Sequence, residues 1–152
     1  KNISPFAEKK LQVLMTHNKP ITLCDSEEQC IEKTDLTVLV LPTPSLESGE
    51  FSNEFLITAL EKCAKALMKK NTYHLFSIIS TVSPQSTNNV LIPLIEKISK
   101  KKCGLDFGVC YNPSFIALGS VIKNITQPDF VLLGESDERA GEQLLLIYTQ
   151  LI

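Results

Sequence analysis

The sequence lacks a long hydrophobic run of the kind that crosses a membrane. Its uninterrupted apolar stretches reach about five residues, far short of the roughly 20 that span a bilayer. The opening segment is neither the arginine-rich stretch of a transit peptide nor the apolar core of a signal peptide. We therefore expect a cytoplasmic protein with no membrane partner.

An excess of charge of one sign is also missing. Fifteen basic residues stand against seventeen acidic ones, which gives a net charge of -2. No overall field therefore attracts nucleic acid, and no nucleic-acid partner is expected. Arg139 is the single arginine, so the planar fork that grips phosphate or carboxylate is nearly absent. A phosphate site would have to use backbone amides or lysine.

The cysteines and histidines do not form a recognisable metal or redox motif. The five cysteines are odd in number and contain no C-x-x-C pair, which argues against a disulfide framework and against a zinc site. Reduced, mostly buried thiols are the interpretation we prefer, and no metal is expected. His17 and His74 lie at predicted helix ends, where a solvated surface role is expected for each.

Glycine is scarce where dinucleotide-binding proteins need it. None of the six glycines lies two positions from another, so the G-x-G-x-x-G loop that cradles a pyrophosphate is absent, and so is a P-loop. The chain nevertheless has 43% hydrophobic residues over 152 positions. That composition and length predict one folded domain over residues 1–152.

Hydrophobic patterning predicts that strands and helices alternate. Continuous aliphatic runs indicate strands buried on both faces, whereas stripes at helical spacing behind Ser, Asp or Pro caps indicate helices. The alternation predicts an α/β domain with a mainly parallel sheet. The expected strands are Ile21–Cys24, Leu36–Leu41, Leu75–Ile79, Asp106–Cys110 and Val131–Leu133. The expected helices are Pro5–Thr16, Asp25–Glu32, Ser52–Lys70, Ser86–Lys100 (with Pro93 either as a kink or accommodated near the start) and one after Ser136–Asp137.

Small polar residues and prolines follow three of the predicted strands, at Pro42–Pro44, Ser80–Pro84 and Asn112–Ser114. The carboxyl ends of parallel strands are where ligands bind in an open sheet. Each corner is equally well explained as a helix cap, because Ser, Thr and Asn are the preferred caps. We expect Thr43, Thr81 and Asn112 to converge on a shared cleft.

Four blocks of the sequence together resemble the UDP-glucose/GDP-mannose dehydrogenase family. They are Asp35–Pro44, Ser80–Pro84, Tyr111–Gly119 and Pro128–Gly134, in the family's order, within a match from about Ser4 to Leu151. The resemblance implies a Rossmann-like three-layer domain that lacks the first βαβ unit. It further implies nucleotide-sugar metabolism, polysaccharide biosynthesis and the NAD-dependent oxidation of a sugar C6 alcohol to a carboxylate.

The resemblance also implies residue roles. Pro42, Thr43, Pro44, Ser80 and Thr81 would line the NAD site. Thr81 would also be catalytic, because a Thr hydroxyl at a strand end can orient a water or an alcohol, although it cannot itself serve as a base. The residues that would bind a nucleotide sugar such as UDP-glucose are Asn112, Pro113, Ser114 and Phe115.

The chain departs from the family pattern in several places. Ser114 and Leu118 stand where the family has carboxylates, and Phe130 stands where it has an arginine. The glycine-rich loop, the catalytic lysine and the nucleophilic cysteine of the family have no counterpart here. The resemblance therefore implies an incomplete dehydrogenase, inactive alone. The alternatives are a non-catalytic module that binds a nucleotide, a nucleotide sugar or a protein, and a flavodoxin-like or receiver-like domain, which is disfavoured because no acidic cluster ends the first strand.

The missing βαβ unit predicts an unusual sheet edge. In the strand order 3-2-1-4-5-6, two absent strands would lie between the Ile21–Cys24 strand and the next one. An apolar strand at Thr37–Leu41 cannot remain an open edge without inviting pairing. We expect it to pair with the Ile21–Cys24 strand, with another chain or with the missing parts of the family enzyme.

Overall fold

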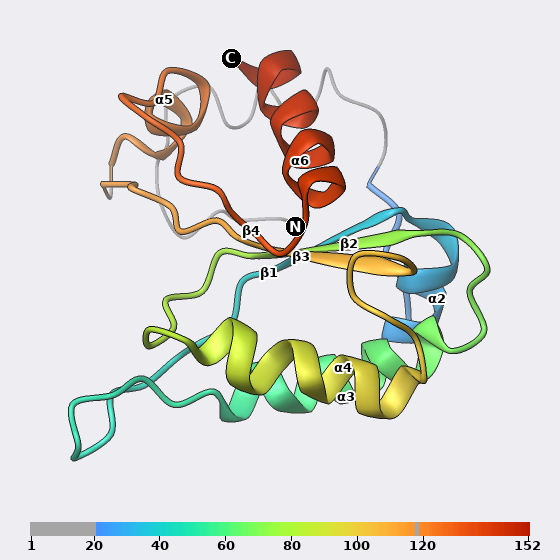
Figure 1. Cartoon of the computed structure of the whole chain (residues 1–152). Helices are drawn as coiled ribbons and strands as arrows, with labels where there is room; N and C mark the ends of the chain where they lie inside the picture. The colour runs from blue at the N-terminus through green and yellow to red at the C-terminus, as the bar shows by residue number, and fades with distance from the viewer. Residues whose placement is uncertain (1–20, 118) are drawn as a thin grey trace.

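A four-stranded sheet lies between helices on both of its faces (Figure 1). The computed structural model describes residues 21–117 and 119–152. The sheet order is β1-β2-β3-β4, in which the first three strands are parallel and β4 is antiparallel to β3. The strands are β1 (Leu36–Leu39), β2 (His74–Ile78), β3 (Phe107–Tyr111) and β4 (Gly134–Glu135), and the helices are α2 (Glu27–Lys33), α3 (Glu54–Leu67), the π-helical turn η1 (Thr87–Leu91), α4 (Ile92–Ser99), α5 (Val121–Thr126) and α6 (Glu138–Leu151).

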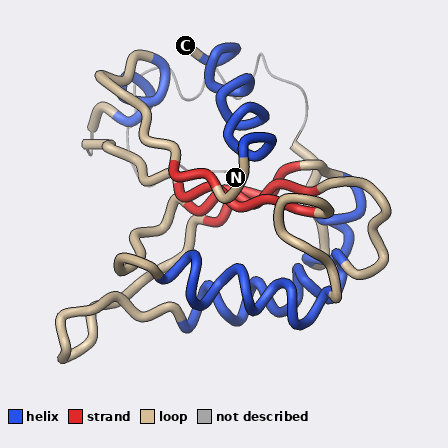
Figure 2. The backbone as a smooth tube through the Cα atoms, in the orientation of Figure 1, coloured by secondary structure: helices blue, strands red, loops and turns tan. Residues whose placement is uncertain are grey.

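Two apolar cores confirm the three-layer arrangement. Helices α3 and α4 cover one face of the sheet and α6 covers the other, with the strands forming a single band between them (Figure 2). The larger core packs Phe76 and Phe107 against the leucines of α3. The smaller core packs Leu75 and Cys110 against Leu144 of α6. All five residues of β2 are buried, as expected for a strand between two helical layers.

The predicted helix over Ser86–Lys100 is present, with a π-helical turn before Pro93. The amide of Ile92 donates to the carbonyl of Thr87, five residues earlier. Proline has no N–H for the usual bond to the fourth residue before it, and a π-turn is one way in which a helix accommodates this loss. Lys100 then ends the helix in a left-handed conformation.

Two predicted strands are wrong. Residues 21–24 are not a strand; Ile21 and Leu23 are 80% and 90% exposed, because this short apolar run has no strand beside it within the described residues. Residues 131–133 are not a strand either. The pairing with β3 starts at Gly134 and runs antiparallel. After Asn112 the chain forms α5 beyond the carboxyl end of β3 and then returns toward that same end, so β4 runs in the direction opposite to β3. Helix α5 itself was not predicted.

His74 is not on the surface as predicted. It is fully buried at the start of β2, and its Nε2 lies 2.9 Å from the Thr37 hydroxyl oxygen. Its place at a predicted helix end suggested exposure, but the side chain faces the α3 layer, where its ring lies against Phe76. The predicted helix at Pro5–Thr16, His17 and Leu118 lie outside the described residues.

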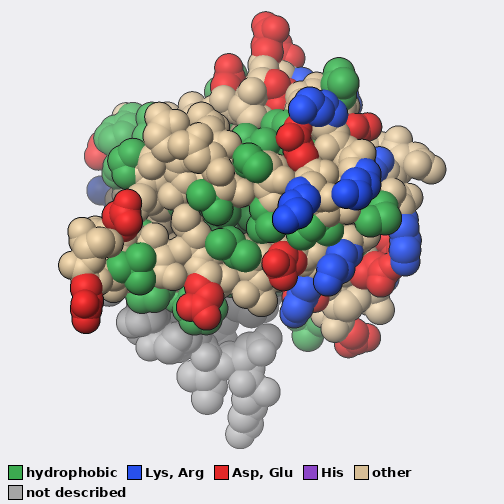
Figure 3. Space-filling view, turned by 60° about the horizontal axis from the view of Figure 1, so that its bottom comes forward, with side chains coloured by type: hydrophobic (Ala, Val, Ile, Leu, Met, Phe, Trp, Pro, Cys, Tyr) green, Lys and Arg blue, Asp and Glu red, His purple; other side chains and the backbone are tan. Residues whose placement is uncertain are grey.

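The outer face of α3 and its surroundings carry lysines interleaved with acids (Figure 3). Lys62 and Lys69 pair with Glu27 and Glu28 of α2 at 2.9 and 2.6 Å. These pairs are largely exposed and contribute little stability. Among the described residues, no helix is both long enough and apolar enough to span a membrane.

Candidate functional site

The three predicted corners lie next to one another at the carboxyl ends of the strands, because β1, β2 and β3 are parallel and adjacent. Ser80 joins the first two corners: its hydroxyl accepts from the Leu41 amide at 2.7 Å and donates to the Leu41 carbonyl at 2.8 Å. The amide of Asn112 donates to the Ile78 carbonyl at 2.8 Å and so joins the third corner to the second. Hydrogen bonds from one side chain and from the backbone thus connect all three corners in series.

The hydroxyl groups at the first two corners differ in availability. Ser80 is buried, and its oxygen already serves both backbone groups of Leu41. It therefore acts as a cross-link between strand ends rather than as a group that faces a ligand. Thr43 is half-buried and Thr81 is exposed, so both side chains reach solvent.

Asn112 is held from two sides. It is 3% exposed, its Nδ2 donates to the Leu132 carbonyl at 3.0 Å, and its Oδ1 accepts from the Tyr148 hydroxyl at 2.7 Å. Buried amide groups need such partners, because an unsatisfied one costs about 1–3 kcal/mol. The end of β3 is therefore fixed both to the segment before β4 and to helix α6.

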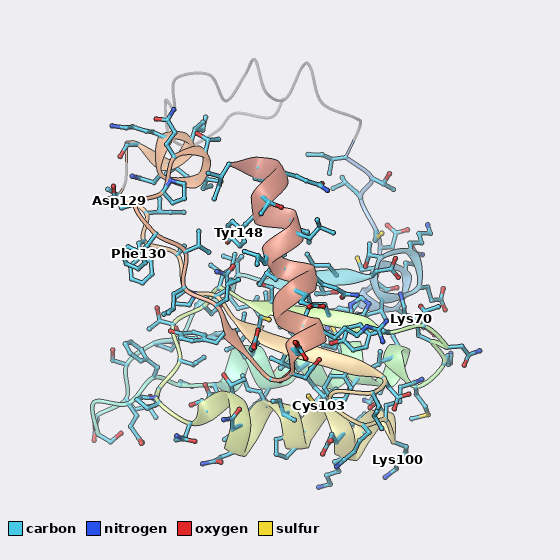
Figure 4. All side chains as sticks on the ribbon, turned by 45° about the horizontal axis from the view of Figure 1, so that its top comes forward. Lys70, Lys100, Cys103, Asp129, Phe130 and Tyr148 are labelled. Atoms are coloured by element: carbon cyan, nitrogen blue, oxygen red, sulfur yellow. The ribbon has the colours of Figure 1, made fainter. Side chains whose placement is uncertain are left out.

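A cavity of about 90 Å³ opens beside this third corner. In Figure 4, Asp129 and Phe130 lie on the segment between α5 and β4, and Tyr148 lies on the side of α6 that faces this segment. Phe115 and Phe130 are in contact, with ring centroids 4.5 Å apart. The cavity is lined by Asn112–Ile116, Asn124, Ile125, Pro128–Val131 and Tyr148.

The cavity brings together some of the predicted site residues and not others. Asn112, Pro113, Ser114 and Phe115 all line it. The residues predicted for the cofactor, at 42–44 and 80–81, do not appear in its lining. Sequence reasoning also missed Tyr148, which lies on the helix predicted after Ser136–Asp137. A tyrosine among the apolar residues of a helix carries a hydroxyl group that can bind a polar partner, and this feature is visible in the sequence.

A second, larger groove of about 630 Å³ lies where the loop before α3 meets the turn before η1. The Phe51 amide donates to the Ser83 hydroxyl at 2.8 Å, and Asn53 Nδ2 donates to the Ser86 hydroxyl at 3.2 Å. Glu50, Glu54 and Glu61 also line this groove. Three carboxylates make it a poor place for a phosphate group.

The described thiols are not placed for nucleophilic chemistry in the cavity beside Asn112. Burial raises the pKa of Cys63 and of Cys110 to about 11, so both stay protonated near neutral pH, whereas the thiolate is the reactive form. Cys24, Cys30 and Cys103 are half-buried. None of the five lines the cavity beside Asn112.

Comparison with known proteins connects this arrangement to one group of enzymes. The GDP-mannose 6-dehydrogenase of Pseudomonas syringae pv. tomato is 34% identical over 149 residues, which is 98% of this chain and 34% of that protein. A UDP-glucose 6-dehydrogenase of Haloferax volcanii is 35% identical over 119 residues, 78% of this chain and 28% of that protein. The chain thus spans about a third of the length of these relatives.

Solved structures agree with the sequence comparison. The GDP-mannose dehydrogenase of Pseudomonas aeruginosa, solved as a ternary complex, superposes with a TM-score of 0.89 at 31% identity, over 97% of this chain and 34% of that one. The UDP-glucose dehydrogenase of Pyrobaculum islandicum gives 0.76 at 27% identity, over 85% and 29%. Residues 1–152 match the NAD binding domain of one family. The chain belongs to the UDP-glucose/GDP-mannose dehydrogenase family.

Proposed function

We propose that this chain is part of an NAD-dependent nucleotide-sugar 6-dehydrogenase, which oxidises the C6 alcohol of a nucleotide sugar to a carboxylate. The enzyme would act in the cytoplasm and supply sugars for polysaccharide biosynthesis. The observation that carries the proposal is the similarity to GDP-mannose 6-dehydrogenases along 98% of the chain. The cavity beside Asn112 supports it, because the residues expected to bind the sugar nucleotide line that cavity.

The proposed substrate site combines an aromatic wall with polar groups. Phe115 and Phe130 are 55% and 58% exposed and lie in contact at the cavity. Exposed aromatic faces can pack against the apolar face of a sugar or against a base. Asn124 and Asp129 supply an amide and a carboxylate for hydroxyl groups.

The residues at the first two corners fit only part of an NAD molecule. Pro42, Thr43, Pro44 and Thr81 can form one wall, with Thr81 also orienting the substrate alcohol. A pyrophosphate needs backbone amides at a helix N-terminus, but α3 starts ten residues after Pro44 and carries Glu54 in its first turn. The diphosphate cradle has to come from outside these residues.

Ser114 argues for the binding-module alternative. A serine hydroxyl does not ionise near neutral pH as a carboxylic acid does, so it cannot replace the acid that the family pattern places there. We therefore propose that the chain alone binds without turning over. In the full-length protein, Ser114→Glu should raise turnover if only the acid is missing, and should leave it unchanged if the site only binds.

Thermal denaturation with UDP-glucose, GDP-mannose and NAD tests the proposal. A ligand at one hundred times its dissociation constant adds about 2.7 kcal/mol to the free energy of unfolding, which raises Tm by roughly 5 to 10 °C for a domain of this size. We expect such a rise with a nucleotide sugar. Phe130→Ala should weaken that ligand about threefold to tenfold, whereas Phe55→Ala, at a 48% exposed position on α3, should not. The absence of any shift with all three ligands contradicts the proposal.

A further inference from the structure

Two half-buried cysteines lie close together where the chain enters helix α2. Cys24 precedes the helix, and Cys30 is its fourth residue. Both line a groove of about 490 Å³ between α2, α3 and β1. A hydrogen bond with the Cys24 thiol raises the pKa of Cys30, and burial adds to this effect. The two sulfur atoms are therefore neighbours on one surface.

The cap of α2 brings the two cysteines together. The Gln29 amide donates to the Ser26 hydroxyl at 3.3 Å, and Gln29 Oε1 accepts from the Asp25 amide at 3.5 Å. This reciprocal pairing is a variant of the capping box, in which the chain before the cap folds back toward the fourth residue of the helix. Cys24 thus approaches Cys30 because of the backbone path at the cap, and not only because of their short separation in sequence.

The two cysteines differ in how firmly they are held. Cys30 lies on α2, where Ile31 is fully buried and its carbonyl accepts from Lys70 Nζ at 3.0 Å. Cys24 instead ends the stretch 21–24, whose two large aliphatic side chains are largely exposed. A small molecule can therefore reach Cys24 from solvent, while Cys30 stays in place beside it.

A third thiol in the groove is less suited to react. Cys63 of α3 also lines the groove, but it is buried. Burial raises its pKa to about 11, and the thiolate is the form that reacts with a disulfide. Thiol–disulfide exchange in this groove therefore falls to Cys24 and Cys30.

We propose that Cys24 and Cys30 form a redox modification site, at which a small-molecule disulfide such as oxidised glutathione converts the two thiols to one reversible disulfide bond. The Cys24 thiolate attacks a sulfur of the small disulfide and releases one thiolate, and the Cys30 thiolate then attacks the Cys24 sulfur and releases the second. The two cysteine protons pass to the released thiolates. The two electrons lost by the cysteine sulfurs reduce the small disulfide. In a reducing compartment the bond is transient.

Mass spectrometry of the whole chain treated with oxidised glutathione tests this site. We expect the chain to lose two hydrogen atoms, and excess reduced glutathione to restore them. Cleavage after Glu27 and Glu28, which lie between the two cysteines, gives peptides that only a Cys24–Cys30 disulfide joins. The ratio of this disulfide to the glutathione adduct should be about tenfold higher in the folded chain than in urea, because the fold holds the thiols together.

Four variants identify the reacting pair. Cys24→Ser and Cys30→Ser should each abolish the internal disulfide and leave at most a glutathione adduct on the remaining cysteine. Cys63→Ala, the matched control in the same groove, should keep it. Cys103→Ser is a second control that leaves the groove untouched. Cys103 is half-buried like the pair, but its thiol hydrogen-bonds to Ser136 and not to another thiol.

Three results would overturn the proposal. The first is an unmodified chain that forms only glutathione adducts or does not react. The second is a disulfide that joins Cys30 to Cys63 in place of Cys24. The third is the same ratio of internal disulfide to adduct in the folded chain and in urea, which would mean that the fold does not bring the two thiols together.

Discussion

Replacing Gly108 by alanine should strongly destabilise the fold, because the added Cβ on β3 would overlap with Tyr73 and with side chains at the start of α6. A Cβ atom there would lie 2.7 Å from the Ala140 Cβ, 2.9 Å from Asp137 Oδ2, and closer still to the Tyr73 hydroxyl. That hydroxyl donates to Asp137 Oδ1 at 3.2 Å, and the Arg139 guanidinium lies 3.8 Å above the Tyr73 ring. Burial and the Asp137 carboxylate both raise the pKa of Tyr73, so it stays a donor.

The magnitude combines three terms. Overpacking costs about 1–3 kcal/mol, and loss of a hydrogen bond to a charged group costs about 1.5–3 kcal/mol. Restricting the unfolded chain by replacing glycine offsets about 0.4–1 kcal/mol. The free energy of unfolding of Gly108→Ala should therefore fall by about 2–5 kcal/mol, as measured by urea denaturation.

A matched control and a double-mutant cycle separate the steric and hydrogen-bond terms. Gly134→Ala on β4 places its Cβ 3.5 Å from Tyr111 atoms, an ordinary contact, and should change stability by less than about 0.5 kcal/mol. Tyr73→Phe removes the clashing hydroxyl, so Gly108→Ala in that background should cost about 1–2 kcal/mol less. If Gly108→Ala matches the unmodified protein in stability, or costs the same in both backgrounds, the reasoning about this contact is refuted.

Three further substitutions test polar groups elsewhere in the structure. Burial and the charge of Lys70 lower the pKa of His74 to about 4, so folding favours its neutral form. This preference contributes about 3 kcal/mol to the free energy of unfolding above pH 6.5, and the contribution is lost as the pH falls toward 4. The free energy of unfolding of His74→Gln, measured by urea denaturation, should therefore depend less on pH over that range. Tyr148→Phe leaves Asn112 Oδ1 without its partner and should lower the free energy of unfolding by about 1 kcal/mol; an unchanged urea midpoint would contradict this. Lys70→Met removes the donor to two backbone carbonyls and a carboxylate and should lower the free energy of unfolding by about 1–3 kcal/mol. Lys69→Met, in an exposed pair, should lower it by less than about 0.5 kcal/mol. Equal effects of the two substitutions in chemical denaturation would argue against a stabilising role for the buried Lys70 ammonium.

Local sequence signals predicted the three parallel strands. Apolar runs predicted β1, β2 and β3, and β2 is buried throughout, as a strand covered on both faces should be. The burial of β1 on both faces was predicted wrongly, because Val38 is 49% exposed. The same signal failed at Ile21–Cys24, where the residues are apolar but no strand lies beside them. Strand formation needs a partner, and a short apolar run does not reveal one.

The sequence likewise predicted one part of the candidate site and not the rest. The prolines and hydroxyl residues after each strand predicted the three corners, and parallel pairing makes these corners adjacent. The sequence did not reveal that Ser80 uses its hydroxyl on Leu41, or that the cavity forms at the third corner without the other two.

The sequence by itself determined the alternation of strands and helices, the positions of the corners and the family to which the chain belongs, because each of these depends on residues that are close together along the chain. Only the tertiary structure decided that Tyr148 holds Asn112, that Phe115 meets Phe130, and that β1 has a strand on one side only within residues 21–117 and 119–152. These features join residues from separate elements. Their geometry depends on how the layers pack, and no local pattern encodes that packing.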